Sequence, residues 1–154
     1  MKITFRLPNG AKADIDIAGG GKNVCIFPLT KSNKVVLAKQ FRPGPQKVLN
    51  ELPGGKVDLS ESPRAAAGRE LLEETGYKGD LVFIGKTFNS AYHKTIRYNF
   101  VAKNCIKVGD QKLDEHEFIE PTLMTLKEFR RHLRLGNLTD IATGYLALDY
   151  LKLL

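Results

Sequence analysis

Apolar and polar residues alternate along the first part of the chain, which is the pattern of half-buried β-strands. Residues 2–7 and 11–17 follow this pattern on either side of a Pro-Asn-Gly turn, so we expect a β-hairpin within an N-terminal extension over residues 1–20. Residues 24–29 and 34–40 repeat the arrangement around a second polar turn. The chain therefore begins with pairs of antiparallel strands.

Residues 41–55 carry three prolines and three glycines, a density that favours an irregular loop crossing a functional surface. A helix is predicted after this loop, over about residues 63–75. Ser62 can act as its N-cap, Pro63 takes the first helical position, and Gly76 stands where a left-handed C-cap belongs.

In the second half of the chain, residues 81–87 and 95–102 have the composition of strands, and loops are expected between and after them. A capping-box sequence beginning at Thr125 predicts a second helix that ends at Gly136. A Thr-Asp pair at residues 139–140 can cap a third helix. Strands interleaved with three helices predict an α/β (α+β) fold, with a mixed β-sheet and helices packed on its faces.

Composition agrees with one globular domain over residues 1–154, because 42% of the residues are hydrophobic and 27% are charged. No apolar stretch approaches the roughly 18 residues of a membrane span, and no signal peptide is recognisable. Cys25 and Cys105 are isolated, which is typical of reduced thiols. We therefore expect a cytoplasmic protein. The net charge of +7 leaves nucleic acid, acidic membranes and anionic small molecules open as partners.

Three carboxylates share one face of the first predicted helix, since Glu70, Glu73 and Glu74 stand at positions i, i+3 and i+4. A solvated acidic face is the ordinary explanation of such a cluster. Two neighbours favour a cation site instead. Arg69 stands four residues before Glu73 and can hold it by an ion pair, and the Gly54-Gly55 pair before the helix permits a close backbone approach. Clustered carboxylates with a loop carbonyl suit a hard divalent cation that bridges to phosphates.

The same residues carry a family resemblance. The Nudix box has the form G-x5-E-x7-R-E-U-x-E-E-x-G-U, where U is bulky and apolar, and the chain resembles it at every position through Gly55, Glu61, Arg69-Glu70-Leu71, Glu73-Glu74, Gly76 and Tyr77. The resemblance implies the Nudix fold, a mixed β-sheet sandwiched between α-helices. It also implies hydrolysis of a nucleoside diphosphate linked to a group X, giving a nucleoside monophosphate and X-phosphate.

Segments outside the box resemble those of the ADP-ribose and nucleoside-diphosphate-sugar pyrophosphatases: Gln40-Phe41-Arg42, Glu51-Leu52-Pro53-Gly54-Gly55, Asp114-Glu115-His116-Glu117 and Gly136-Asn137-Leu138-Thr139-Asp140. This branch implies that the Gly54 carbonyl, Glu70 and Glu74 hold Mg²⁺, or Mn²⁺ as a substitute, with Glu73 assisting. It implies Glu115 or Glu117 as the general base. It also implies a homodimer and a small-molecule nucleoside diphosphate derivative as substrate, with neither a membrane nor a nucleic acid as partner.

Several roles stay open between binding and structure. Arg42 is either a phosphate ligand or a solvated charge, while Phe41 beside it is expected in the core. Glu51 can reach the metal or the sugar. Arg69 is expected to orient Glu73, and Glu61 to tie the loop to the helix, with Gly55 and Gly76 as structural members of the motif.

One segment departs from the pyrophosphatase pattern. The Pro usual in the loop after the box is missing from residues 89–93, and Tyr92 there resembles the dinucleoside polyphosphate hydrolases. Tyr92 can stack on a nucleobase or pack under the loop. The alternatives are therefore a dinucleoside polyphosphate or capped-RNA hydrolase, and a non-catalytic nucleotide-binding Nudix domain.

Overall fold

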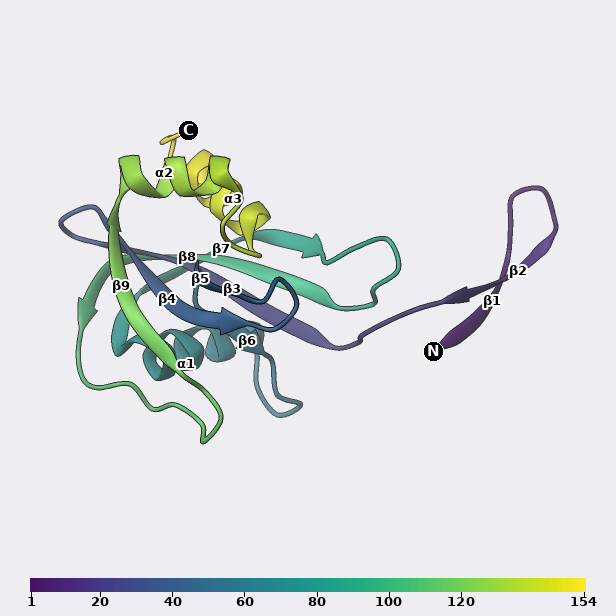
Figure 1. The fold of residues 1–154 in the computed structure, drawn as a ribbon, viewed down its shortest axis with the longest axis horizontal. Coiled ribbons are helices and arrows are strands. Elements are labelled where there is room, and N and C mark those ends of the chain that lie inside the picture. The colour runs from purple at the N-terminus through teal and green to yellow at the C-terminus, as the bar shows by residue number, and fades with distance from the viewer.

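The computed structural model describes residues 1–154 (Figure 1). The strands are β1 (Lys2–Arg6), β2 (Lys12–Asp16), β3 (Lys22–Thr30), β4 (Lys34–Arg42), β5 (Lys47–Glu51), β6 (Gly54–Lys56), β7 (Tyr77–Phe88), β8 (Ile96–Lys107) and β9 (Ile119–Thr125), and the helices are α1 (Pro63–Thr75), α2 (Leu126–Leu135) and α3 (Ile141–Tyr150). No helix has the length and apolar content that crossing a membrane requires.

A seven-stranded mixed sheet forms the centre, in the order β5-β4-β3-β8-β7, with β6 paired to β3 and β9 paired to β4. The β3–β8 pair is parallel and the other pairs are antiparallel. Strands β3 and β4 share a single register pair, Leu29 with Val35. The two halves of the sheet therefore meet at one end only and part towards the other.

Helices cover both faces of the sheet, which confirms the predicted fold class (Figure 1). On one face, Leu71 of α1 packs in a buried cluster with Val24 of β3. On the other face, Phe27 of β3 meets Phe129 of α2 edge to face, with ring centroids 5.2 Å apart. Because alternate residues of β3 enter opposite cores, this strand is apolar throughout its middle, as a doubly covered strand must be.

The first helix occupies the predicted residues. The Ser62 side chain accepts a hydrogen bond from the Ala65 N–H (3.1 Å), and Gly76 ends the helix at φ 75°. A Cβ at Gly76 would also overlap the Gly109 carbonyl. Both the positive φ and this close contact therefore require glycine here. The capping box that begins α2 is also present, with Thr125 and Glu128 bonding each other's backbone N–H.

Residues 41–55 differ from the expected irregular loop. The prolines and glycines are confined to two short stretches, residues 43–45 and 53–55, and the sequence between them forms β5, which pairs with β4. The β4–β5 turn is completed by Gln46 at a positive φ of 54°. Phe41 is 58% exposed rather than part of the core, because it lies on the outer face of this hairpin.

Strand β9 falls where only a loop was expected. Pro121 interrupts its apolar pattern, but β9 pairs with β4 alone, and proline is tolerated on an edge strand. Strands β7 and β8 also extend beyond residues 81–87 and 95–102 as one long antiparallel pair. The ends of these strands are set by pairing with a neighbouring strand, and local composition carries no information about that pairing.

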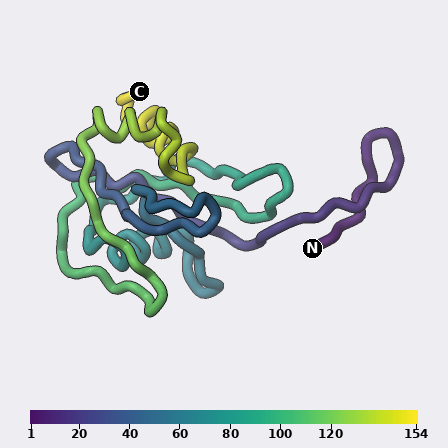
Figure 2. Tube along the Cα trace, in the orientation of Figure 1, coloured from purple at the N-terminus to yellow at the C-terminus, as the bar shows by residue number.

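The N-terminal hairpin is present as predicted, and it forms a two-stranded sheet of its own. Figures 1 and 2 show β1 and β2 projecting away from the main body at the end of an extended segment. The connection is made at Ala18, whose N–H donates to the Tyr92 carbonyl (2.8 Å) and whose carbonyl accepts the Lys94 N–H (2.9 Å). The hairpin thus contacts the body mainly through the β7–β8 turn.

Candidate active site

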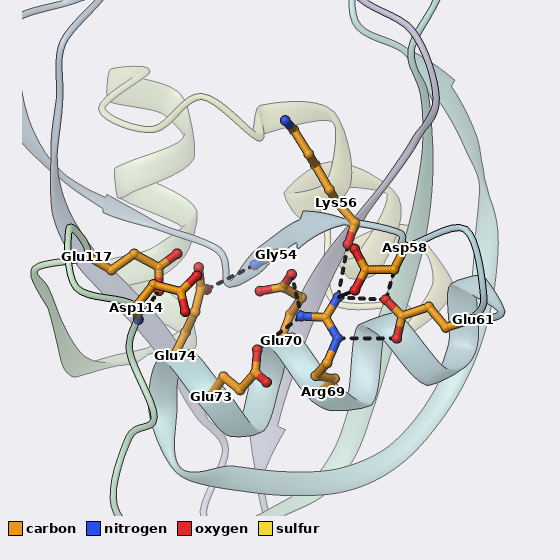
Figure 3. Close-up of polar contacts among 10 residues, drawn as sticks. All are labelled: Gly54, Lys56, Asp58, Glu61, Arg69, Glu70, Glu73, Glu74, Asp114 and Glu117. Atoms are coloured by element: carbon orange, nitrogen blue, oxygen red, sulfur yellow. Dashed lines mark hydrogen bonds and ion pairs between the residues drawn. The ribbon is translucent and has the colours of Figure 1, made fainter.

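Arg69 is the hub of the acidic face of α1 (Figure 3). Its guanidinium lies 3.0 Å from Glu70 Oε1 and 3.0 Å from Glu73 Oε2, so the predicted pairing with Glu73 is present. A third carboxylate, Glu61, lies 2.6 Å from Nη2 and also accepts the Asp58 N–H, which ties the preceding loop to the helix. These hydrogen bonds lower the pKa of Glu61 and raise the pKa of Arg69, so the hub stays charged.

Glu74 is the most buried carboxylate of this face, with 5% of its surface exposed. Its Oε2 accepts the Gly54 N–H at 3.0 Å. Burial raises the pKa of Glu74 to about 8, the charges of Glu70 and Glu117 add to this, and the Gly54 N–H opposes it. Burial likewise raises the pKa of Glu70, against the attraction of Arg69. The protein thus holds Glu70, Glu74 and Glu117 close together without enough positive charge to stabilise all three in the ionised form.

Gly54 lets β6 lie close to the backbone of β3, and Gly55 leaves room for the Glu70 carboxylate. A Cβ at Gly54 would overlap the Val24 carbonyl, and a Cβ at Gly55 would overlap the Glu70 carboxylate. No other residue type fits at either position without displacing a neighbour. The glycine pair that the sequence singled out therefore brings β6 next to the α1 carboxylates, with room for Glu70 at Gly55 and a hydrogen bond to Glu74 from the Gly54 N–H.

The donor set fits a divalent cation such as Mg²⁺. In this conformation no three acidic, histidine or cysteine side chains converge on one cation position. The chemistry of the set is nevertheless suitable, because the half-buried Glu70 and the buried Glu74 are oxygen donors whose ionised forms need a positive charge, and the Gly54 N–H is in contact with Glu74. Glu73 is more exposed than Glu70 and lies one helical turn after it on the same face of α1.

The loop between β8 and β9 is attached to the end of α1. The Gln111 side chain donates to the carbonyls of Glu74 (2.5 Å) and Ile119 (2.8 Å), and the Lys112 N–H donates to the Glu73 carbonyl (2.8 Å). These bonds bring Glu117 to the acidic face, where its charge raises the pKa of both Glu70 and Glu74.

The two candidate bases in this loop are placed differently. The Glu117 carboxylate points towards Glu74 (Figure 3) and accepts the Asp114 N–H at 3.0 Å. Glu115 lies two residues earlier and is exposed. Spacing alone left the two equivalent.

A cavity of about 410 Å³ opens beside the glycine pair, between the two halves of the sheet. It is lined by residues 23–24 of β3, 42–45 of the β4–β5 turn, Gly54 and Gly55, Arg97, and residues 139–140 before α3. Gly54 and Gly55 belong to both the cavity and the acidic face, so they join the two parts of the site.

Arg42 lines this cavity, and the buried Glu51 beneath the lining binds the Arg42 side chain. The Arg42 Nε donates to Glu51 Oε1 at 3.2 Å, while Glu51 Oε2 accepts the Thr139 N–H (2.8 Å) and hydroxyl (3.1 Å). The Glu51 side chain has no exposed surface. The expected contact of Glu51 with a metal or a sugar is absent in this structure, because the Glu51 carboxylate has no exposed surface and holds Arg42 and Thr139 instead.

Two further positions differ from the sequence-based picture. Tyr92 is 61% exposed in the β7–β8 turn and does not line the cavity. Arg97 of β8, which the sequence analysis did not single out, does line it and lies 3.0 Å from Asp140 Oδ1. Asp140 thus stands at the N-cap of α3 without making a side-chain capping bond. The sequence did offer one signal for this role. Arg97 alternates with Asn99 and Val101 along β8 and so shares their buried face, where a charged residue needs a partner.

Gly55→Ala tests whether the room left for the Glu70 carboxylate matters. Because the new methyl group overlaps the Glu70 carboxylate, we expect a loss of Mg²⁺ affinity of about 10- to 100-fold, the range for residues that support metal ligands. Isothermal titration with Mg²⁺ measures it. Gly109→Ala, where no atom lies within 4 Å of the new Cβ, is the matched control. Equal Mg²⁺ affinities of the two variants would contradict the expectation.

A family model, curated relatives and a solved structure all match this chain. A sequence model of the NUDIX domain matches residues 20–141. A methanol dehydrogenase activator of Bacillus methanolicus is 33% identical over 150 residues, which are 96% of this chain and 80% of the relative. An ADP-ribose pyrophosphatase of Bacillus subtilis (strain 168) is 32% identical with the same coverage. A crystal structure of an ADP compounds hydrolase superposes with a TM-score of 0.80 at 22% identity, covering 98% of this chain and 84% of the other.

Proposed function

Because the chain belongs to the NUDIX family and is a Nudix hydrolase, we propose that it cleaves the diphosphate of ADP-ribose or a related nucleoside diphosphate sugar, using Mg²⁺. The products are a nucleoside monophosphate and a sugar phosphate. The observation that carries the proposal is the contact of the buried Glu74 carboxylate with the Gly54 N–H, where the acidic face meets a polar cavity. Relatives named for ADP-ribose and ADP-sugar pyrophosphatase activity support this substrate class.

The chain's own residues divide the work. Glu70, Glu74 and the Gly54 carbonyl would hold Mg²⁺, with Glu73 assisting. When bound, Mg²⁺ neutralises the diphosphate and polarises its phosphorus–oxygen bonds. Arg42, held by Glu51, binds a phosphate oxygen from the cavity side. Glu117 accepts the proton of the attacking water as the new oxygen–phosphorus bond forms and the bridging phosphorus–oxygen bond breaks.

No observation favours either alternative function, the other hydrolase activities or the non-catalytic domain. The dinucleoside polyphosphate and capped-RNA hypotheses drew on Tyr92, which does not line the cavity. A non-catalytic domain would lack part of the acidic set, and every box carboxylate is present.

Adenylate release tests the proposal. ADP-ribose, ADP-glucose, diadenosine polyphosphates and NADH are incubated in parallel with the full chain and Mg²⁺. We expect the highest kcat/KM for one of the two ADP-sugars, complete loss with a chelator, and recovery on adding Mg²⁺ or Mn²⁺. Preference for diadenosine polyphosphates would contradict the substrate class. Tight nucleotide binding without turnover of any substrate would replace the enzyme by a binding domain.

We also propose a homodimer. The projecting β1–β2 hairpin is a two-stranded sheet, which is marginally stable when isolated in water. Phe41, Val48 and Phe118 present exposed apolar surface on the main body, at 58%, 59% and 82% exposure. A second copy of the chain can cover both features. Light scattering of the full chain should give the mass of a dimer, and removal of residues 1–18 should give a monomer.

A further inference from the structure

The cavity beside β6 has an unusual lining for a nucleotide site. Val24 is its one hydrophobic residue, and no aromatic ring lines it. A nucleobase gains affinity mainly by stacking on an aromatic ring, and the lining offers only the small apolar surfaces of Val24, Pro43 and Pro45. The cavity instead presents amide, hydroxyl and guanidinium groups. These are partners for a ligand rich in hydroxyl and phosphate oxygens.

Two arginines are fixed within this lining by carboxylates that solvent hardly reaches. Arg42 is tied through Nε to Glu51, and Arg97 is tied through Nη2 to Asp140, at 3.2 and 3.0 Å. Each carboxylate engages one nitrogen of its arginine, so each guanidinium keeps further N–H donors. An arginine held in this way loses little side-chain entropy when it binds an oxyanion.

Strand register places Arg97 at a definite distance from the glycine pair. Arg97 is paired with Asn23 of β3, and Asn23 is paired with Lys56 of β6, next to Gly55. Arg97 is therefore two strands away from β6, about 10 Å at the usual spacing between strands. A substrate whose diphosphate lies at Gly54 and Gly55 would extend one sugar unit before it reaches Arg97.

From this placement we propose that Arg97 is a substrate-binding residue for the X side of the substrate, a hydroxylated sugar phosphate, and that Asp140 is the residue that positions it. The nucleobase then lies outside this cavity. The inference rests on the proposed function, because it assigns one side of the same substrate. Its distinctive consequence is that the two products are bound by different residues.

Binding of the two products tests this inference without turnover. Ribose 5-phosphate and AMP are titrated separately into the full chain and into Arg97→Lys, which keeps the charge facing Asp140 but lacks the planar fork. Loss of one charge-assisted hydrogen bond should weaken ribose 5-phosphate binding by about tenfold or more. AMP binding should stay unchanged. Arg130→Lys, on the exposed face of α2, is the matched control and should behave like the wild type.

The positioning role is tested by a double-mutant cycle. Asp140→Asn should weaken ribose 5-phosphate binding in the wild-type chain and have no further effect in Arg97→Gln, which lacks the charge that Asp140 holds. Thermal melting of every variant shows whether the fold is kept, and Arg97→Gln provides a second substitution if Arg97→Lys melts early. Additive effects would assign Asp140 a structural role only.

The failures of the two proposals are separable. If the wild type hydrolyses ADP-ribose while Arg97→Lys and Arg97→Gln bind ribose 5-phosphate as tightly as the wild type, the assignment of Arg97 is overturned and the proposed function stands. Equal weakening of AMP and ribose 5-phosphate would overturn the assignment to the X side. If the wild type hydrolyses no nucleoside diphosphate sugar, the proposed function fails, whatever the binding data show.

Discussion

Glu74→Gln should lower kcat for ADP-ribose by about 10³-fold or more. A bound cation contributes several kcal/mol of transition-state stabilisation, and an amide replaces one of its charged ligands. The fold should remain, because the Gln carbonyl oxygen can accept the Gly54 N–H that Glu74 Oε2 accepts at 3.0 Å. Burial raises the pKa of Glu74 to about 8, so the metal-free fold already carries a largely neutral side chain there at neutral pH.

Steady-state adenylate release measures the fall in kcat, and Mg²⁺ titration measures the loss of metal affinity. Glu73→Gln, at a more exposed position of the same helix face, should lose less activity. Glu120→Gln, on the surface of β9 beside Lys39, is a control for the removal of one carboxylate charge. Normal turnover by Glu74→Gln would remove Glu74 from the proposed metal ligands.

Glu117→Gln should lower kcat by about 10²- to 10⁴-fold, the range for loss of a general base, while KM changes little. The reason is position, since Glu117 points to Glu74 (Figure 3) and its charge raises the pKa of both Glu70 and Glu74. The same substitution at Glu115 gives a direct comparison within one loop. We expect Glu115→Gln to retain most of the activity.

The order of the two activities decides between the two candidate bases. The reverse order of activities, with Glu115→Gln inactive and Glu117→Gln active, would assign the base to Glu115.

Local signals explain what the sequence predicted well. The bounds of α1 follow from Ser62, Pro63 and Gly76, each of which acts within one helical turn of the residue it affects. The acidic cluster follows in the same way from the spacing of Glu70, Glu73 and Glu74 along that helix. Helix geometry fixes these relations before any tertiary contact forms.

The missed features depend on contacts between distant parts of the chain. Strand β9 is a strand because β4 pairs with it, and Pro121 hides its pattern. Arg97 belongs to the cavity because the start of α3 brings Asp140 to β8, although the two residues are 43 positions apart in the chain. Glu51 was expected to face a ligand, and only the fold shows that Thr139 and Arg42 occupy its oxygens.

The parting of the sheet at β3 and β4 has a consequence for divergence among relatives. These strands share one register pair, Leu29 with Val35, and the cavity lies between the two halves that separate from there. Residues 43–45 of the β4–β5 turn form part of its wall and contribute nothing to either buried core cluster. Insertions in this turn can therefore reshape the chamber for a larger or smaller X while the hydrolytic carboxylates on α1 keep their places, so specificity and chemistry can evolve on separate segments.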